Sequence, residues 1–144
     1  MGVTMEMYNA VMAIPAGKEL DELIAEKVLG WKRMPHWWTP PGRATDGGFA
    51  NPPAFSTDIT AAWAVVEHYP EYISLHKRAY PNMLPYEVNI RAGAGFPHNL
   101  FIAEGETMPL AVCRTALLAE RVPSSLLPDV RHTKEGEGEG AIAP

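Results

Sequence analysis

A proline-rich loop leads directly into a helix-start signal between residues 52 and 66. Two adjacent prolines are followed within a few residues by Ser56, Thr57 and Asp58, whose side chains can accept hydrogen bonds from the free amides of a first helical turn. The apolar residues that follow at helical spacing are Ile59, Ala62, Trp63 and Val66. This stretch predicts a helix that packs its apolar face against the rest of the chain.

Two more amphipathic helices are predicted, one on each side of this helix. The first begins near Lys18 and ends at Gly30, whereas the last begins at Thr107, tolerates Pro109 in its first turn and ends near residue 121. The residues at helical spacing are Leu20, Leu23, Ile24 and Val28 in the first of them and Leu110, Cys113, Leu117 and Leu118 in the last. Each helix therefore has one apolar face to bury.

An antiparallel hairpin is predicted over residues 86–104. Apolar and polar residues alternate over residues 86–91, which indicates a strand with one buried face, and residues 100–103 form the returning strand. Residues 32–38 fit a short strand that a proline confines to a sheet edge, while residues 71–85 fit no single element. These patterns predict an α+β fold with three amphipathic helices layered on a small, mostly antiparallel sheet.

The chain of 144 residues is about one domain long. Residues 17–122 contain the predicted helices and the hairpin and form the single domain. Residues 1–16 show neither a helical nor a strand period and are predicted to be an N-terminal extension. Residues 123–144 combine a proline-bounded coil with an alternating run of Gly and Glu, which predicts a flexible tail because this composition buries little apolar surface.

Charge and composition argue against several classes of partner. The net charge of −5 disfavours the binding of extended nucleic acid, which depends on clustered Lys and Arg. No run approaches the roughly 20 apolar residues that cross a bilayer, and the first residues lack the basic start of a secretory signal. The one cysteine, Cys113, cannot form an internal disulfide, and its place on an apolar helical face predicts an unreactive core residue. We therefore expect a cytoplasmic protein.

The sequence carries no recognisable motif of catalysis or metal binding. The five histidines show no short spacing with cysteine or carboxylate of the kind that binds zinc or iron, and neither a phosphate-binding loop nor a dinucleotide fingerprint is present. We therefore expect a protein without enzymatic activity, bound metal or cofactor.

The long loop over residues 39–55 is the best candidate for a binding site, because loops of this length are usually either functional or disordered and nearby tryptophans favour order. Trp37 and Trp38 stand at its start, and Arg43 and Asp46 supply one cation and one anion within it. This composition suits a planar ring with a polar edge. The alternative is that one tryptophan covers the core beneath the loop while the other lies in a protein interface.

Asp58 and Arg114 are charged residues at the edges of otherwise apolar helical blocks. One interpretation is a structural ion pair that joins the two helices, with Asp58 also serving the helix start. The other is that Arg114 faces a cleft and binds a phosphate or carboxylate through its planar guanidinium. The sequence alone leaves both interpretations open.

Three blocks of the sequence resemble a known family. They are residues 19–31 (ELDELIAEKVLGW), residues 55–63 (FSTDITAAW) and residues 109–117 (PLAVCRTAL). In this order they are similar to the phage ABA sandwich domain proteins, small proteins of bacteriophages and prophages named for an α/β/α arrangement of layers. The resemblance covers residues 19–120 and implies an α/β/α sandwich, a phage accessory protein in the cytoplasm of the bacterial host, and no assigned activity.

These observations lead to two hypotheses of function. In the first, the protein is a non-enzymatic homo-oligomer that binds a small nucleotide-like ligand and sequesters a host immune signalling nucleotide, by analogy with other small phage proteins. Its candidate ligand-binding residues are Trp37, Trp38, Arg43, Asp46, Ser56, Thr57, Asp58 and Arg114. The tryptophans would stack on the base, the arginines would neutralise phosphate, and the helix start would bind the anion. In the second, the protein binds a host or phage protein through its Trp-rich loop.

Overall fold

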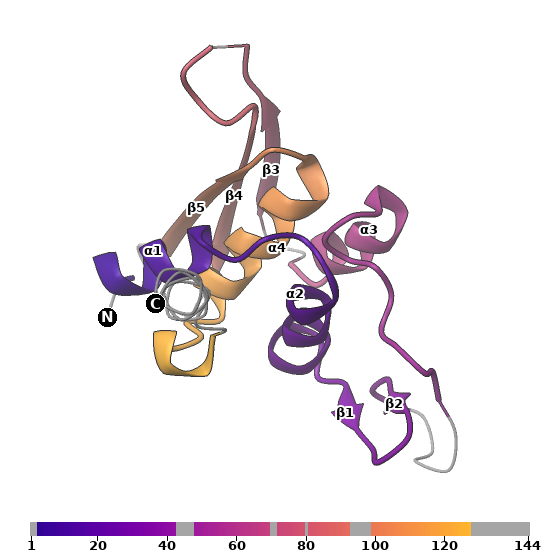
Figure 1. Cartoon of the computed structure of the whole chain (residues 1–144). Coiled ribbons are helices and arrows are strands. Elements are labelled where there is room, and N and C mark those ends of the chain that lie inside the picture. The colour runs from indigo at the N-terminus through magenta and orange to yellow at the C-terminus, as the bar shows by residue number, and fades with distance from the viewer. Residues whose placement is uncertain (1–2, 43–47, 70–71, 80, 93–98, 128–144) are drawn as a thin grey trace, which may run out of the picture.

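The computed structural model describes residues 3–42, 48–69, 72–79, 81–92 and 99–127. The helices are α1 (Met5–Met12), α2 (Lys18–Leu23), which continues as the π-helical turn η1 (Ile24–Val28), α3 (Ile59–Glu67), α4 (Met108–Ala119) and the 3₁₀ turn η2 (Ser124–Leu126). The strands are β1 (Lys32–Arg33), β2 (Trp38–Thr39), β3 (Ile73–Lys77), β4 (Tyr86–Ala92) and β5 (Asn99–Gly105). The predicted α+β class is confirmed, and these described segments hold four α-helices where three were predicted (Figure 1).

An antiparallel sheet in the order β3-β4-β5 forms one side of the molecule. The predicted hairpin is confirmed as β4 and β5, and its turn over residues 93–98 lies outside the described residues. β3 falls within the stretch that fitted no single element. Val88 in the middle strand lies opposite Leu75 of β3 and Ala103 of β5, so these three side chains share the face that points toward the helices.

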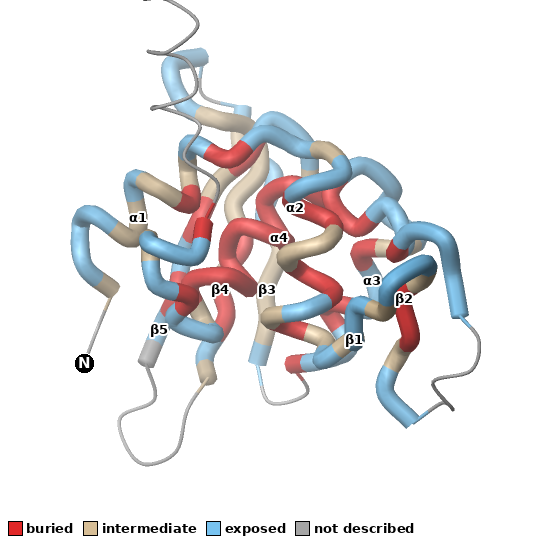
Figure 2. Tube along the Cα trace, turned by 60° about the horizontal axis from the view of Figure 1, so that its bottom comes forward, coloured by how far each residue is buried: buried red, intermediate tan, exposed pale blue. Residues whose placement is uncertain are grey.

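Helix α4 lies at the centre of the fold, and every residue from Pro109 to Leu118 is buried (Figure 2). The Thr107 hydroxyl accepts a hydrogen bond from the amide of Leu110 at 3.3 Å and caps the helix start, as predicted. α4 packs on β4 and β5, while α1, η1 and α3 surround its other sides. Cys113 is fully buried here, which confirms it as a core residue, and burial raises the pKa of its thiol.

The opposite face of the sheet is more exposed to solvent. Leu100 and Ile102 on that face of β5 are 47% and 39% exposed. Arg91 lies beside the Tyr72 ring, with its guanidinium carbon 5.2 Å from the ring centroid. The three-stranded sheet is therefore well covered by helices on one face only, among the parts of the chain that the structure describes.

Helix α1 forms within the first sixteen residues, where the sequence showed no helical period. The Thr4 side chain caps it by accepting a hydrogen bond from the amide of Met7 at 3.1 Å. Val11 and Ile14 are 0% and 1% exposed, and α1 packs against α4. The helix is short and only Val11 of it is fully buried, so its apolar period is too brief to recognise in the sequence.

Helix α3 begins as predicted but buries a different face. Asp58 is its N-cap, and its carboxylate accepts a hydrogen bond from the amide of Thr60 at 2.9 Å. The residues that α3 buries are Ala62, Val65 and Val66. Ile59 and Trp63 are 48% and 51% exposed, so the prediction that they belong to the buried face is wrong. The helix is apolar on nearly all sides, and the spacing alone therefore does not select the side that packs.

The segments 31–42 and 48–49 form an arm that extends away from the sheet, here called the aromatic arm (Figure 1). Where one short strand was predicted at residues 32–38, the structure has two strands of two residues, β1 and β2, which pair with each other. Trp38 also pairs with Phe49 through two backbone hydrogen bonds. Gly48 permits this pairing, because a Cβ atom there would lie 2.1 Å from the carbonyl oxygen of Trp38. Among the described residues, none of the helices is both long and apolar enough to cross a membrane.

Candidate functional site

Ser56 forms buried hydrogen bonds that connect the loop before α3 to α2. Its side chain is completely buried, and its backbone amide and hydroxyl both donate to the Asp21 carboxylate, at 2.8 and 2.7 Å. The hydroxyl oxygen also accepts a hydrogen bond from the amide of Gly17 at 2.9 Å. The predicted role of Ser56 in anion binding would require these bonds to break, so its evident role is structural.

Thr57 and Asp58 lie at the surface, beside the start of α3. The Thr57 amide donates to the carbonyl of Ala54 at 3.2 Å, and the Asp58 amide donates to the same carbonyl at 2.9 Å. Because the Asp58 carboxylate already accepts from the helix start, a negative side chain occupies the position where an anionic ligand was predicted.

Arg114 is buried in the core and is only 4% exposed. Its Nη1 donates to the carbonyl of Glu104 and its Nη2 to the carbonyl of Ile14, both at 2.9 Å. Loss of hydration lowers the pKa of the guanidinium, although Glu106 partly opposes this effect. The ion pair with Asp58, one of the two interpretations that the sequence left open, does not form, because both side chains use backbone partners instead.

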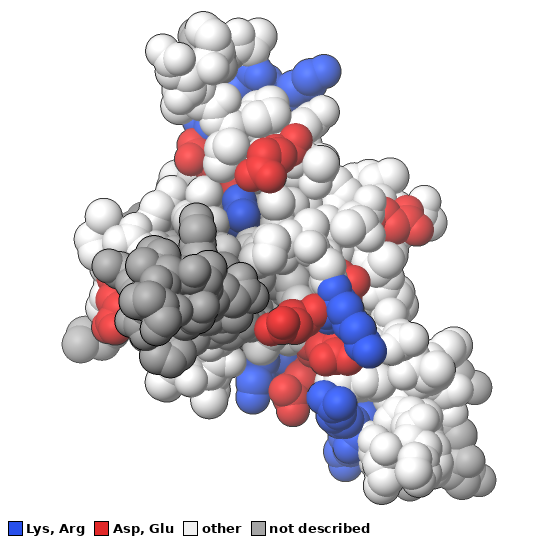
Figure 3. Space-filling model, in the orientation of Figure 1, with Lys and Arg blue, Asp and Glu red and all other residues white. Residues whose placement is uncertain are grey.

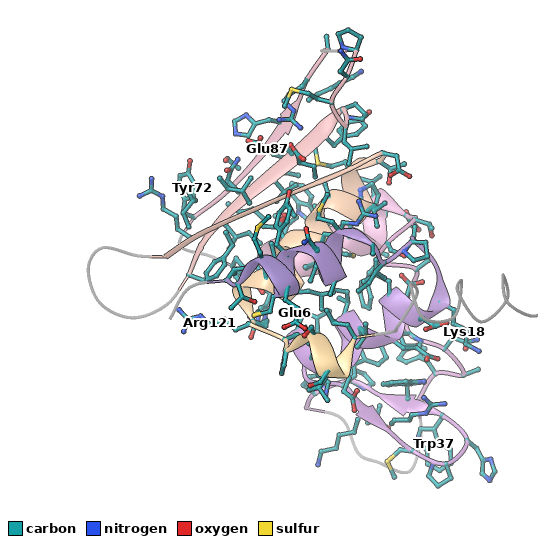
Figure 4. All side chains as sticks on the ribbon, turned by 60° about the vertical axis from the view of Figure 1, so that its left-hand side comes forward. Glu6, Lys18, Trp37, Tyr72, Glu87 and Arg121 are labelled. Carbon is teal, nitrogen blue, oxygen red and sulfur yellow. The ribbon has the colours of Figure 1, made fainter. Side chains whose placement is uncertain are left out.

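The two predicted tryptophans have different surroundings. Trp38 is 4% exposed and takes the place predicted for a tryptophan that covers the core beneath the loop. Trp37 lies farther out on the aromatic arm, where its Nε1 donates to the Thr39 hydroxyl at 3.1 Å (Figure 4). Arg43 and Asp46 lie outside the described residues.

A cavity of about 280 Å³ opens at the root of the aromatic arm, between α2, η1, β1, β2 and the C-terminal turn η2. Four of its lining residues are charged and four are apolar. They are Glu19, Glu22, Glu26 and Arg33, and Leu23, Trp38, Leu126 and Leu127. Of the predicted site residues that the structure describes, only Trp38 lines this cavity.

The charged residues of the cavity favour a cation over an anion. The three glutamates follow one another at spacings of three and four residues, so they lie along one side of α2 and η1. Arg33 lies 3.8 Å from Glu22, and its guanidinium carbon is 5.3 Å from the centre of the Trp38 ring. Figure 3 shows acidic and basic side chains gathered over α2 and β1. Three carboxylates against one guanidinium repel a phosphate group.

Sequence reasoning missed this cavity, although part of its signal was present. The sequence shows an acidic stripe at helical spacing, formed by Glu19, Glu22 and Glu26. The other half of the cavity comes from β1 and from η2. Of these two elements, η2 lies far from α2 in the sequence, at residues 124–126. Among the described residues, no group of three or more His, Cys, Asp or Glu is arranged to hold a metal ion.

Comparison with known proteins identifies the family. The phage ABA sandwich domain matches residues 22–117, well over half of the chain. A crystal structure of a phage protein from Bacillus cereus ATCC 14579 is similar, with a TM-score of 0.59 and 25% sequence identity over 76% of this chain and 91% of that protein. A search of the curated proteins finds no match. The blocks that suggested the family at residues 55–63 and 109–117 lie within the matched region, and the chain belongs to the phage ABA sandwich domain family.

Proposed function

We propose that this protein is a non-enzymatic phage accessory protein that binds a basic, partly apolar segment of a host or phage protein in the cavity at the root of the aromatic arm. Because the family is a phage family, we place this activity in the cytoplasm of the bacterial host. The observation that carries the proposal is that the Arg33 guanidinium lies over the Trp38 ring and also close to the Glu22 carboxylate.

Arg33 indicates which chemical group the cavity accepts. A guanidinium over an indole ring is attracted electrostatically to the negative face of the ring, and a nearby carboxylate attracts its positive charge further. The Arg33 side chain is 66% exposed and comes from a strand of only two residues, so an arginine or lysine of a partner can displace it. Glu19 and Glu26 line the same cavity and offer further carboxylates to a second basic residue.

Apolar surface next to the charges supports a protein partner. Leu126 lines the cavity and is 52% exposed, while Trp38 and Leu127 supply buried apolar walls. Phe49 on the aromatic arm is 45% exposed and lies 5.7 Å from Trp31, centroid to centroid. Aromatic residues beside a charged rim are typical of the centres of protein interfaces.

Binding of a nucleotide-like ligand stays a prediction, and the described residues give it less support. Ser56 and Arg114 are held in buried hydrogen bonds, and the cavity beside Trp38 is lined by three carboxylates. A phosphate group would meet unfavourable charge there. For this reason the protein-binding hypothesis is the stronger of the two.

The proposal can be tested with defined peptides. Fluorescence anisotropy would measure the affinity for a short peptide that contains arginine next to leucine, for the same peptide with arginine replaced by glutamate, and for a panel of cyclic and linear nucleotides. We expect the double variant Glu22→Gln, Glu26→Gln to bind the basic peptide about tenfold more weakly, because it removes two carboxylates of the cavity. Glu67→Gln is the matched control, since Glu67 is exposed on α3 and does not line the cavity.

Two outcomes would contradict this function. The first is equal affinity of the wild-type protein for the arginine peptide and its glutamate version. The second is a peptide affinity that falls as much in Glu67→Gln as in the double variant. If the protein bound nucleotides and neither peptide, the nucleotide-sequestration hypothesis would replace the peptide-binding one.

A further inference from the structure

Strand β3 is the outer strand of the sheet and pairs on one side only, with β4, among the described residues (Figure 1). The Tyr72 carbonyl accepts from the amide of Arg91 at 3.2 Å, and the Arg78 amide donates to the carbonyl of Pro85 at 2.6 Å. Along an antiparallel strand, the backbone N–H and C=O groups of successive residues point alternately to one neighbouring strand and to the other side. Because Tyr72 and Arg78 face β4, the amides and carbonyls of Ile73, Leu75 and Lys77 point to the unpaired side.

The apolar side chains of β3 are also incompletely covered. Ile73 and Leu75 lie opposite Ile90 and Val88, which are both completely buried on the helix-facing side of β4. Ile73 and Leu75 themselves are only half-buried, because α4 packs on β4 and β5 and makes no comparable contact with β3. Unpaired backbone groups and partly covered apolar side chains therefore lie along the same edge.

We propose that a second copy of this chain pairs with β3 through its own β3, in antiparallel orientation, with Leu75 of each protomer opposite the partner's Leu75. This register places Ile73 opposite the partner's Lys77, so all the outward backbone groups of Ile73, Leu75 and Lys77 meet hydrogen-bonding groups of the partner. The two three-stranded sheets join into one continuous sheet with twofold symmetry.

The charges and side chains of β3 are compatible with pairing to itself. Lys77 is the single charged residue of the strand, and in this register the two lysines lie at opposite ends of the new ladder, each next to isoleucine. Ser74 faces the partner's His76, which pairs polar groups on the other face. β3 has no proline, bulge or central charge, the features that usually keep an exposed sheet edge from pairing.

Disulfide crosslinking tests this register directly. In the proposed pairing the two Leu75 Cα atoms lie about 5.5 Å apart, which suits a disulfide bond. We expect the Leu75→Cys variant to form a covalent dimer under mild oxidation. The native Cys113 is fully buried and adds no background reaction. Ile102→Cys is the control, because Ile102 lies on β5, at the other end of the strand order.

A second measurement does not depend on disulfide formation. Light scattering coupled to size exclusion should give twice the mass of one chain for the wild-type protein. Leu75→Lys places two like charges opposite each other at the twofold axis and should give a monomer with an unchanged far-ultraviolet circular dichroism spectrum, while Ile102→Lys should remain a dimer. A monomeric wild-type protein would overturn the proposal, as would equal crosslinking of the two cysteine variants. Neither result bears on the cavity at the aromatic arm, because β3 does not line it.

Discussion

Arg114 holds three parts of the core together through one planar group. Its hydrogen bonds reach the residue Ile14 beyond α1 and Glu104 near the end of β5, while its own backbone belongs to α4. The guanidinium can serve both carbonyls at once because its donors are fixed in a plane, whereas a lysine ammonium on a flexible chain is a single point of charge. The structural role therefore depends on arginine in particular.

We expect Arg114→Lys to lower the free energy of unfolding by about 2–3 kcal/mol, because a buried carbonyl loses its donor and a charge remains in the core. Urea unfolding followed by circular dichroism would measure this loss. Arg91→Lys is the control, since Arg91 is exposed and its guanidinium lies beside the Tyr72 ring, and its change should stay within about 0.5 kcal/mol. Equal losses in the two variants would contradict a structural role for Arg114.

At the scale of single residues, hydrogen bonds between residues close in the sequence could be predicted, whereas hydrogen bonds between residues far apart in the sequence could not. The capping role of Asp58 follows from side-chain and backbone groups two positions apart in the sequence. In contrast, the bond from Ser56 to Asp21 spans 35 residues and the bond from Arg114 to Ile14 spans 100. Nothing in a single sequence indicates which carbonyl a distant arginine reaches. A structural role was among the interpretations of both Ser56 and Arg114, but the partners that they bind could not be predicted.

At the scale of elements, two glycines allow close approaches of different kinds. Gly48 lies against Trp38 in the aromatic arm, and Gly105 lies against the first turn of α4, where a Cβ atom would be 2.8 Å from the amide nitrogen of Ala111. The neighbouring atom is part of the backbone in both places and cannot move aside without shifting the element. The two positions therefore test whether the arm and the core unfold together.

We expect Gly105→Ala to lower the free energy of global unfolding by about 1–3 kcal/mol through overpacking against α4. Gly48→Ala should instead open only the pairing of Trp38 with Phe49. Amide hydrogen exchange would separate these effects, with faster exchange throughout α4 in the first variant and only at Trp38 and Phe49 in the second. If Gly48→Ala accelerated exchange in α4 equally, the arm would belong to the same cooperative unit as the core.

The elements themselves were largely predictable, while the choice of buried face was not. The β4–β5 hairpin, the start of α3 and the capped start of α4 all follow from short-range patterns. For α3, the sequence ITAAWAVV offers apolar residues on nearly every side, and the position of α4 decides that Ala62 and Val65 turn inward and Trp63 outward. Tertiary packing made that choice.

At the scale of the whole molecule, the first sixteen residues contribute to the core. We expect Ile14→Ala to lower the free energy of unfolding by about 2–5 kcal/mol, because Ile14 is 1% exposed and its removal leaves a cavity. Thermal and urea unfolding would measure the effect. Met5→Ala is the matched control on α1, since Met5 is 72% exposed, and it should have little effect. Similar small losses in both variants would mean that this segment is a peripheral extension, as its lack of periodicity predicted.

The central place of α4 has a consequence for synthesis on the ribosome. The elements that make its main contacts, α1, η1, α3, β4 and β5, all precede it in the chain. Until α4 has left the exit tunnel, those elements expose the apolar surfaces that it covers, and the growing chain cannot reach its stable form in stages. We therefore expect this domain to complete its folding only after α4 has emerged from the ribosome.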